Sequence, residues 1–192
     1  MQRQVIPEPL LALDLIKYQL ANNPEPLRSF VSKSVQEGSD LALIDSSMLV
    51  MLKTLNERAC KFASIPHLGE DTWRSVIAMS KQFNTDRAEL NPAWFAADTE
   101  EFLAEVLSPW LSSPEYELLI PDQSMERDSA NDEFLIHAFS VVNVGVSFVR
   151  GVSATIPNYG DVTAIIGRLV EYFSLMEARG QEYAPFSWDD GS

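Results

Sequence analysis

The sequence predicts an all-α fold, for three reasons. Apolar residues recur at spacings of three and four in at least five segments, Pro and Gly stand where helices begin and end, and strands do not alternate with helices. A chain of 192 residues can bury a sizeable core without disulfides. We therefore expect a single compact, bundle-like domain of about six to eight helices over residues 1–182, with antiparallel neighbours, followed by an aromatic and acidic tail over residues 183–192.

The first 63 residues predict three helices. The first follows Pro7, because Pro costs no hydrogen bond in the first turn of a helix. The second begins after Pro24 and stops before Gly38, a residue type that is common just past helix ends. The third covers about residues 39–62. Its apolar positions, spaced as on a buried helical face, are Leu41, Ile44, Met48, Leu52 and Leu55.

The middle of the chain predicts shorter elements. Residues 71–84 form a fourth helix, and Asp98 opens a further helix with a pattern close to a capping box. Pro109 ends or kinks that helix. Residues 114–121 alternate weakly between two prolines, which indicates an extended piece, and residues 121–131 have the polar composition of an exposed loop.

Residues 134–149 fit two patterns. Alternation from Val142 to Phe148 is typical of a strand, whereas three-to-four spacing is typical of a helix. Length favours the helix, because the apolar pattern runs for about 18 residues and strands rarely exceed ten. Gly145 and Gly151 are then small residues that allow close packing of helices. The helical positions are Leu135, Ala138, Val142, Val146 and Val149.

The last helix is predicted over residues 161–179, with Asp161 as its N-cap and Gly180 at its end. Its polar positions fall outside the apolar stripe, so we expect a core helix and not a partner-binding helix. The aromatic residues of the tail either fold back on the domain or anchor a partner, and we favour folding back. The stripe consists of Val162, Ile165, Ile166, Leu169, Phe173 and Met176.

Composition and charge exclude several classes of protein. The net charge is −14, with 28 acidic against 14 basic residues, whereas binding to nucleic acid or to an anionic membrane requires a basic surface. A single cysteine, Cys60, excludes an intramolecular disulfide. Asp14 and Lys17 interrupt the apolar N-terminal stretch, which does not predict a signal peptide, and no segment has the length and apolarity of a membrane span. We expect a cytoplasmic protein.

Linear motifs for catalysis, metal binding or a cofactor are absent from the sequence. His67, His137 and Cys60 are far apart, and their spacing fits no zinc site. Ser147 follows Gly145 as in a nucleophile elbow, but the second Gly of that motif is missing. Gly-rich phosphate-binding loops are missing too. The sequence therefore predicts no catalytic residue, no metal and no cofactor.

The distribution of charge is the strongest functional signal. Residues 1–60 carry seven acidic and six basic side chains, so nearly all the surplus acid lies beyond them. Between Arg87 and Arg127 there are nine acidic residues and no Lys or Arg. Complementary charge speeds encounter with a partner, and buried aromatic residues dominate binding energy. A solvated acidic face is the alternative. The residues predicted to meet a basic partner are Asp98, Glu100, Glu101, Glu105, Trp110, Glu115, Tyr116 and Glu117.

The sequence thus favours a non-enzymatic, acidic binding protein that covers a basic surface of a protein partner. This profile is shared by inhibitor, immunity, antitoxin and anti-defence proteins, so the expected partner is a nucleic-acid-binding enzyme, a toxin or a defence complex. Two alternatives stay open. One is an enzyme whose carboxylate-built site no linear motif reveals, and the other is an assembly subunit with the apolar helix 134–149 at an oligomer interface. The oligomeric state is not predicted.

Overall fold

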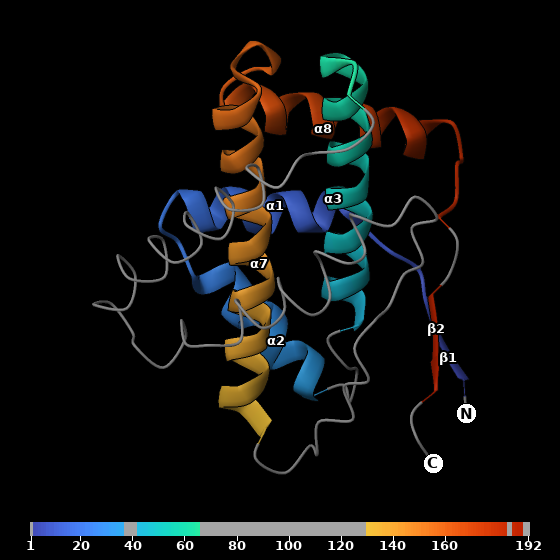
Figure 1. The fold of residues 1–192 in the computed structure, drawn as a ribbon. Coiled ribbons are helices and arrows are strands. Elements are labelled where there is room, and N and C mark those ends of the chain that lie inside the picture. Colours follow the sequence, from blue (N-terminus) through green and yellow to red (C-terminus); the bar gives the residue numbers. More distant parts are fainter. Residues whose placement is uncertain (1, 37–41, 66–129, 184–185, 190–192) are drawn as a thin grey trace.

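The structure is a computed structural model that describes residues 2–36, 42–65, 130–183 and 186–189. Most of these residues are helical, as the sequence predicts, and two short strands lie at the ends of the chain (Figure 1). The predictions for residues 66–129 lie outside the described residues. The elements are β1 (Gln2–Val5), α1 (Pro9–Leu20), α2 (Glu25–Gln36), α3 (Ala42–Ala63), α7 (Ala130–Thr155), the 3-10 helix η3 (Pro157–Tyr159), α8 (Val162–Ala178) and β2 (Phe186–Asp189).

Two long helices, α3 and α7, form the centre of the described fold. They lie side by side and run in the same direction, as the colours of Figure 1 show. The expectation of antiparallel neighbours is therefore wrong for this pair. A short connection forces two helices to run antiparallel, but residues 64–129 separate α3 from α7 and remove that constraint.

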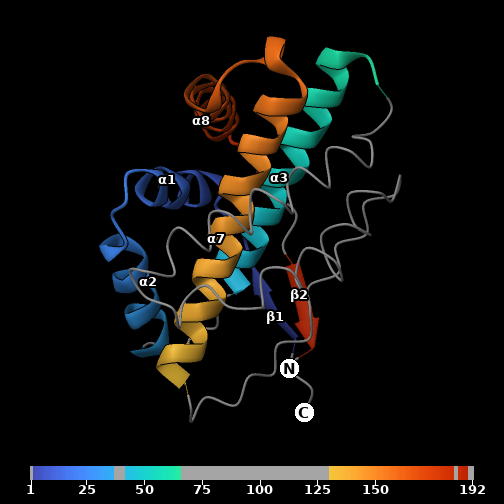
Figure 2. The same cartoon turned by 60° about the vertical axis from the view of Figure 1, so that its left-hand side comes forward.

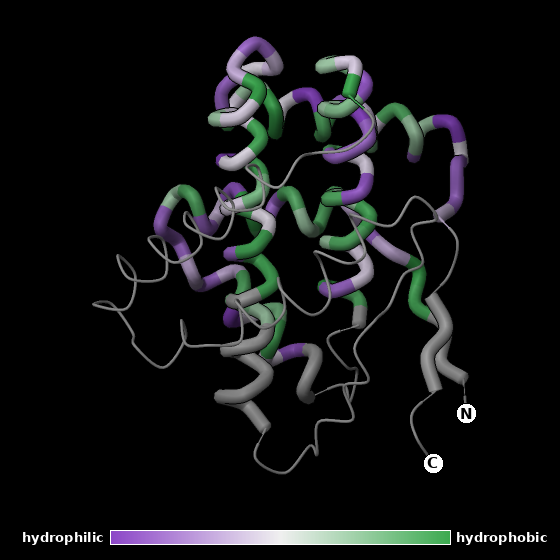
Figure 3. Tube along the Cα trace, in the orientation of Figure 1, coloured by the Kyte–Doolittle hydropathy of each residue, from purple (hydrophilic) through white to green (hydrophobic). Residues whose placement is uncertain are grey.

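The other helices pack across this pair. Helix α1 contacts α3, α7 and α8, and α2 contacts α7. In Figure 2 the view turns by 60°, and α1 and α8 are seen crossing the α3–α7 pair on one side. Hydrophobic residues lie where α1, α3 and α7 meet, and hydrophilic residues lie at the turn between α1 and α2 (Figure 3). The described helices therefore form crossed layers.

Helix α7 is buried on all sides along its central turns. The nine residues from Val141 to Val149 are all buried, and nine successive residues point in every direction around a helix. A helix that is buried all round has no polar face to mark its period. This explains why the sequence of residues 134–149 fits both the helical and the strand pattern. The helical alternative for residues 134–149 is confirmed. A second copy of the chain is not needed to cover this part of α7.

Two contacts fix how α7 meets α1 and α3. At Gly145 a Cβ atom would lie 2.6 Å from Sδ of Met48 and 2.8 Å from Cδ1 of Ile16, so only glycine allows this approach without movement. Gln19 lies about one turn after Ile16 in α1. Its Nε2 donates a hydrogen bond of 2.9 Å to Oδ1 of Asn143 in the buried core. The prediction that Gly145 allows close packing of helices is confirmed.

The ends of α8 follow the sequence prediction. Oδ1 of Asp161 accepts a hydrogen bond of 2.8 Å from the backbone N–H of Ala164, which is N-capping. At the other end Gly180 has a φ of 68°. Its N–H donates to the carbonyl of Glu177 and the next N–H donates to the carbonyl of Met176, as in a Schellman motif. Four residues of the predicted stripe are buried: Ile165, Ile166, Leu169 and Phe173.

The prediction of a mostly helical fold is confirmed for the described residues, and one short strand pair is added to the helices. β1 and β2 pair antiparallel, with Gln2 opposite Asp189 and Val5 opposite Phe186. Residues 186–189 of the tail thus fold back and pair with the N-terminal strand (Figure 1). Each strand is four residues long and finds its partner more than 180 positions away, so no local pattern marks the pair. None of the described helices combines the length and apolarity needed to cross a membrane.

Candidate functional site

The residues predicted to meet a basic partner all lie between positions 98 and 117, outside the described residues. The structure therefore neither brings them together nor separates them. The numbers of charged residues can still be compared between the two parts of the chain. The described residues carry 12 acidic and 10 basic side chains, whereas residues 66–129 hold 13 acidic and four basic ones. The acid surplus thus belongs mainly to the sequence between α3 and α7, while the described residues carry nearly equal numbers of acidic and basic side chains.

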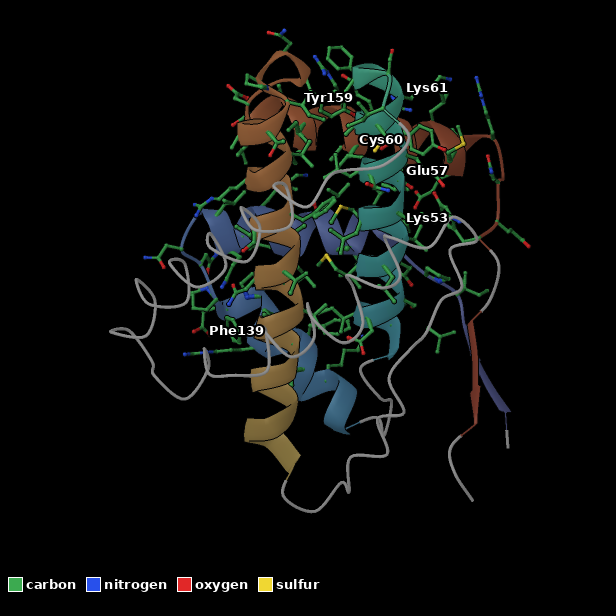
Figure 4. All side chains as sticks on the ribbon, viewed as in Figure 1. Lys53, Glu57, Cys60, Lys61, Phe139 and Tyr159 are labelled. Atoms are coloured by element: carbon green, nitrogen blue, oxygen red, sulfur yellow. The ribbon has the colours of Figure 1, made fainter. Side chains whose placement is uncertain are left out.

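A pocket of about 470 Å³ lies where the end of α3 meets η3 and the first half of α8. Figure 4 labels Lys61 and Tyr159, which lie at the same end of the molecule, near the last turns of α3 and α7. Among the described residues, the lining consists of three basic side chains and two aromatic ones. The lining residues are Arg58, Lys61, Phe62, Tyr159 and Arg168.

Arg168 is held in place by the turn that leads into α8. Its Nη1 donates a hydrogen bond to the carbonyl oxygen of Tyr159, and its guanidinium lies over the Tyr159 ring at 5.3 Å from the centroid. Gly160 makes this turn with a φ of 131°, a conformation that side chains disfavour. The turn returns α8 toward η3, so the guanidinium two turns into α8 comes back over Tyr159.

Two further contacts hold the α3 side of the pocket. The ring of Phe62 meets the Tyr159 ring edge to face, with 5.2 Å between centroids, and Phe62 is still 52% exposed. The guanidinium of Arg58 lies 4.7 Å from the centroid of Tyr172. Cation–π contacts of this kind orient a charge without neutralising it. Within the described part of the chain, no carboxylate forms an ion pair with a cation of this pocket.

The other residues singled out in the sequence have structural positions. Cys60 is buried, and its thiol donates to Oδ1 of Asn56 at 3.6 Å. Ser147 is buried in the middle of α7, whereas a nucleophile elbow is a turn between a strand and a helix. His137 belongs to α7, and its side chain lies outside the description. Among the described residues, no group of three or more His, Cys, Asp or Glu is placed to hold a metal.

Tyr183 is the one described group with a shifted pKa. Burial raises the pKa of this phenol above its ordinary value of 10.0, and the nearby Tyr172 and Glu177 raise it further. Its ring contacts that of Phe173, with 6.1 Å between centroids. The tyrosine therefore stays neutral over the physiological range and acts as part of the packing around α8.

Comparison with known proteins adds no family: no family model matches the chain, and neither a curated protein nor a solved structure resembles it significantly.

Sequence reasoning missed the pocket. Arg58 and Lys61 stand out in the sequence only as basic neighbours of Cys60, and Arg168 only as a polar position outside the stripe of its helix. Arg58 and Arg168 are 110 positions apart. No spacing rule joins two such distant residues, so only the tertiary structure reveals that both line one pocket.

Proposed function

We propose that the protein is a non-enzymatic binding protein that covers a basic surface of a protein partner with the acidic stretch between Arg87 and Arg127. One observation carries this proposal: the surplus acid lies mainly in the single segment between α3 and α7, and the described helices are nearly balanced. A protein that used charge only for solubility would have no need to concentrate it in one stretch. A charge concentrated in one segment supports recognition of a partner with the opposite charge.

The residue types in this stretch suit that role. Glu101 and Glu105 are four positions apart, so they share a face if residues 98–108 are helical. Trp110 and Tyr116 follow within the same acid-rich stretch and can supply the apolar anchors that charge lacks. The expected partner is a nucleic-acid-binding enzyme, a toxin or a defence complex, because each exposes a basic surface. A cytoplasmic location belongs to the same proposal.

The test is the association rate with a partner captured from the native host. We expect Glu101→Lys combined with Glu105→Lys to slow association about tenfold or more, because like charges then meet across the interface. Raising the salt concentration should reduce the difference in association rate between the original protein and the double variant, since the screening length is only about 8 Å at physiological ionic strength. Far-ultraviolet circular dichroism checks that the variant keeps its helices.

The matched control is the double variant Glu177→Lys and Glu182→Lys. Both residues are exposed and lie outside the acidic stretch, and the change in net charge is the same. This control should leave the association rate within about twofold of the original. Equal slowing by both double variants would show that only the net charge matters. If the rate depends neither on the first pair nor on salt, the acidic stretch is a solvated surface and the proposal fails.

A further inference from the structure

We propose that the exposed side of α8 binds α8 of a second copy of this chain in an antiparallel, two-fold arrangement, with Leu175 at the centre of the contact. The residues that carry this inference are Glu171, Leu175 and Arg179, which are all exposed. They follow one another at intervals of four, so they form one ridge on the helix surface. The inference does not rest on the proposed function, because it uses neither the acidic stretch nor its partner.

The two sides of α8 have different surroundings. Ile165, Leu169 and Phe173 are buried, and the helix contacts α1 and α7. Figure 2 looks nearly along α8, which lies at the outside of the described helices. The predicted role in the core therefore belongs to one side of the helix and leaves the other side open to a partner.

Leu175 supplies the apolar centre of this open side. The residue is 46% exposed, so contact with a partner would remove apolar surface from water. Ser174 and Ala178 are exposed beside it, and their small side chains allow a second helix to come close. One exposed leucine is ordinary on a protein surface, so the inference depends on the charges that flank it.

The charges on the two sides of Leu175 have opposite signs. Glu171 lies about one turn before it and Arg179 about one turn after it, where the N–H of Arg179 still donates to the carbonyl of Leu175 at 3.1 Å. Within the described part of the chain, neither side chain forms an ion pair. When two copies meet antiparallel about Leu175, Glu171 of each copy faces Arg179 of the other. A parallel arrangement would place like charges opposite each other.

A second copy suits this side better than a partner with charge of one sign. The two flanking charges cancel, so they favour neither a strongly basic nor a strongly acidic partner, but their order along the helix is complementary to itself. The net charge of −14 opposes the association of two copies. A contact limited to one helix from each copy also lies at the small end of specific interfaces. We therefore expect a weak, reversible dimer.

The experiment is sedimentation velocity of the full chain over a range of concentrations in about 0.15 M salt, where the repulsion between copies is screened beyond about 8 Å. We expect a monomer–dimer equilibrium with a dissociation constant on the order of 10–100 µM. Leu175→Ala should weaken the dimer about tenfold, because it removes the apolar centre of the contact. A chain that stays monomeric at about 1 mM, or a dimer that Leu175→Ala leaves unchanged, overturns the proposal.

Exchanging the two charges tests the antiparallel arrangement itself. Glu171→Arg and Arg179→Glu should each weaken the dimer at least about tenfold, since two pairs of like charges then meet. An equimolar mixture of these two single variants should associate again, because every pair across the heterodimer has opposite charges. The double variant with both substitutions should dimerise about as well as the original chain. If a single substitution leaves the dimer intact, or if the mixture stays monomeric, α8 does not pair in this way.

The matched control is Glu177→Arg. Glu177 is exposed, but it lies two positions after Leu175 and so projects from a different side of the helix. This variant and Glu171→Arg reduce the net negative charge equally, so a weaker dimer in Glu171→Arg does not result from the net charge. We expect Glu177→Arg to change the dissociation constant less than about threefold. Equal weakening by the two variants would overturn the proposal. Far-ultraviolet circular dichroism at low concentration checks that each variant keeps its helices.

Discussion

At the scale of single residues, Gly145 and Gly167 allow a matched test of close packing. Gly145→Ala would place a Cβ atom 2.6 Å from Met48, inside the core, whereas Gly167→Ala meets nothing within 4 Å. Alanine favours a helix over glycine by about 1 kcal/mol, while overpacking costs about 1–3 kcal/mol. We expect Gly145→Ala to lower the free energy of unfolding by about 1 kcal/mol and Gly167→Ala to raise it by about as much.

Urea unfolding of the two variants gives this comparison directly. The substitution and the helical setting are the same in both, so helix propensity cancels and the difference reports the space around the residue. If Gly145→Ala stabilises the protein as much as Gly167→Ala does, then α7 does not approach α1 and α3 as closely as the contacts require.

Tyr183 permits a prediction about pH at the same scale. Its hydroxyl oxygen is buried and has no hydrogen-bond partner within the described part of the structure. Because burial raises its pKa in the folded state, the unfolded chain loses this proton first, so its contribution to stability is lost as pH rises through about 10. Tyr183→Phe keeps the ring and removes the titration.

We therefore expect Tyr183→Phe to be neutral or slightly stabilising at pH 8, because an unsatisfied buried hydroxyl costs about 1–3 kcal/mol. The advantage of the variant over the original protein should grow between pH 8 and pH 11, as measured by urea midpoints at each pH. A Tyr183→Phe variant that is clearly less stable at pH 8 would reveal a hydrogen bond to the phenol, and an advantage that stays constant would show that its pKa is not raised.

At the scale of elements, α8 has a buried side and an exposed side, and the same Leu→Ala substitution on each side compares their contributions to stability. Leu169 is 1% exposed and Leu175, on the same helix, is 46% exposed. Leu169→Ala should lower the free energy of unfolding by about 2–5 kcal/mol, because it removes buried methyl groups and leaves a cavity. Leu175→Ala should cost less than about 1 kcal/mol. Chemical denaturation measures both, and similar losses would mean that the helix faces the core differently.

Helix α7 shows that the spacing of apolar residues alone does not always distinguish a helix from a strand. Its central turns are buried on all sides, so its apolar residues fit the period of a helix and that of a strand. The length of the apolar pattern, which exceeds that of ordinary strands, favours the helix. The hydrogen bond between Gln19 and Asn143 satisfies two polar side chains within that core. Both partners are buried, and leaving either one without its bond would cost stability.

At the scale of the whole molecule, the pairing of β1 with β2 ties the two ends of the chain together. A chain that ends at Tyr183 loses β2 but keeps every described helix. Ladder hydrogen bonds contribute about 0.5–1.5 kcal/mol each, and ordering a strand costs about 1–2 kcal/mol per residue, so the net gain from four residues is small. We expect the truncated chain to keep its helical circular dichroism signal and to lose less than about 1 kcal/mol of stability.

The control for this truncation is a chain that ends at Asp189, which keeps β2 and removes only the last three residues. Its unfolding midpoint should match that of the full chain. Loss of the helical signal in the shorter truncation alone would show that the strand pair is required for the helices to fold.

The sequence by itself determines the helices of the described part. The Asp161 cap and Gly180 mark the two ends of α8, and spacings of three and four mark the buried faces of α1, α3 and α8. These signals involve residues within one or two turns of each other, so they do not depend on the rest of the fold. The acidic stretch is equally plain in the sequence, and its role as a partner-binding surface stays a prediction.

The tertiary structure alone decides which distant residues meet. The parallel course of α3 and α7, the pairing of β1 with β2 and the meeting of Arg58 with Arg168 in one pocket all join residues that are far apart in the chain. Such contacts arise because burying apolar surface fixes where whole helices lie relative to each other, and side chains on the helix surfaces then share the space that this packing leaves. Local patterns contain no information about that space.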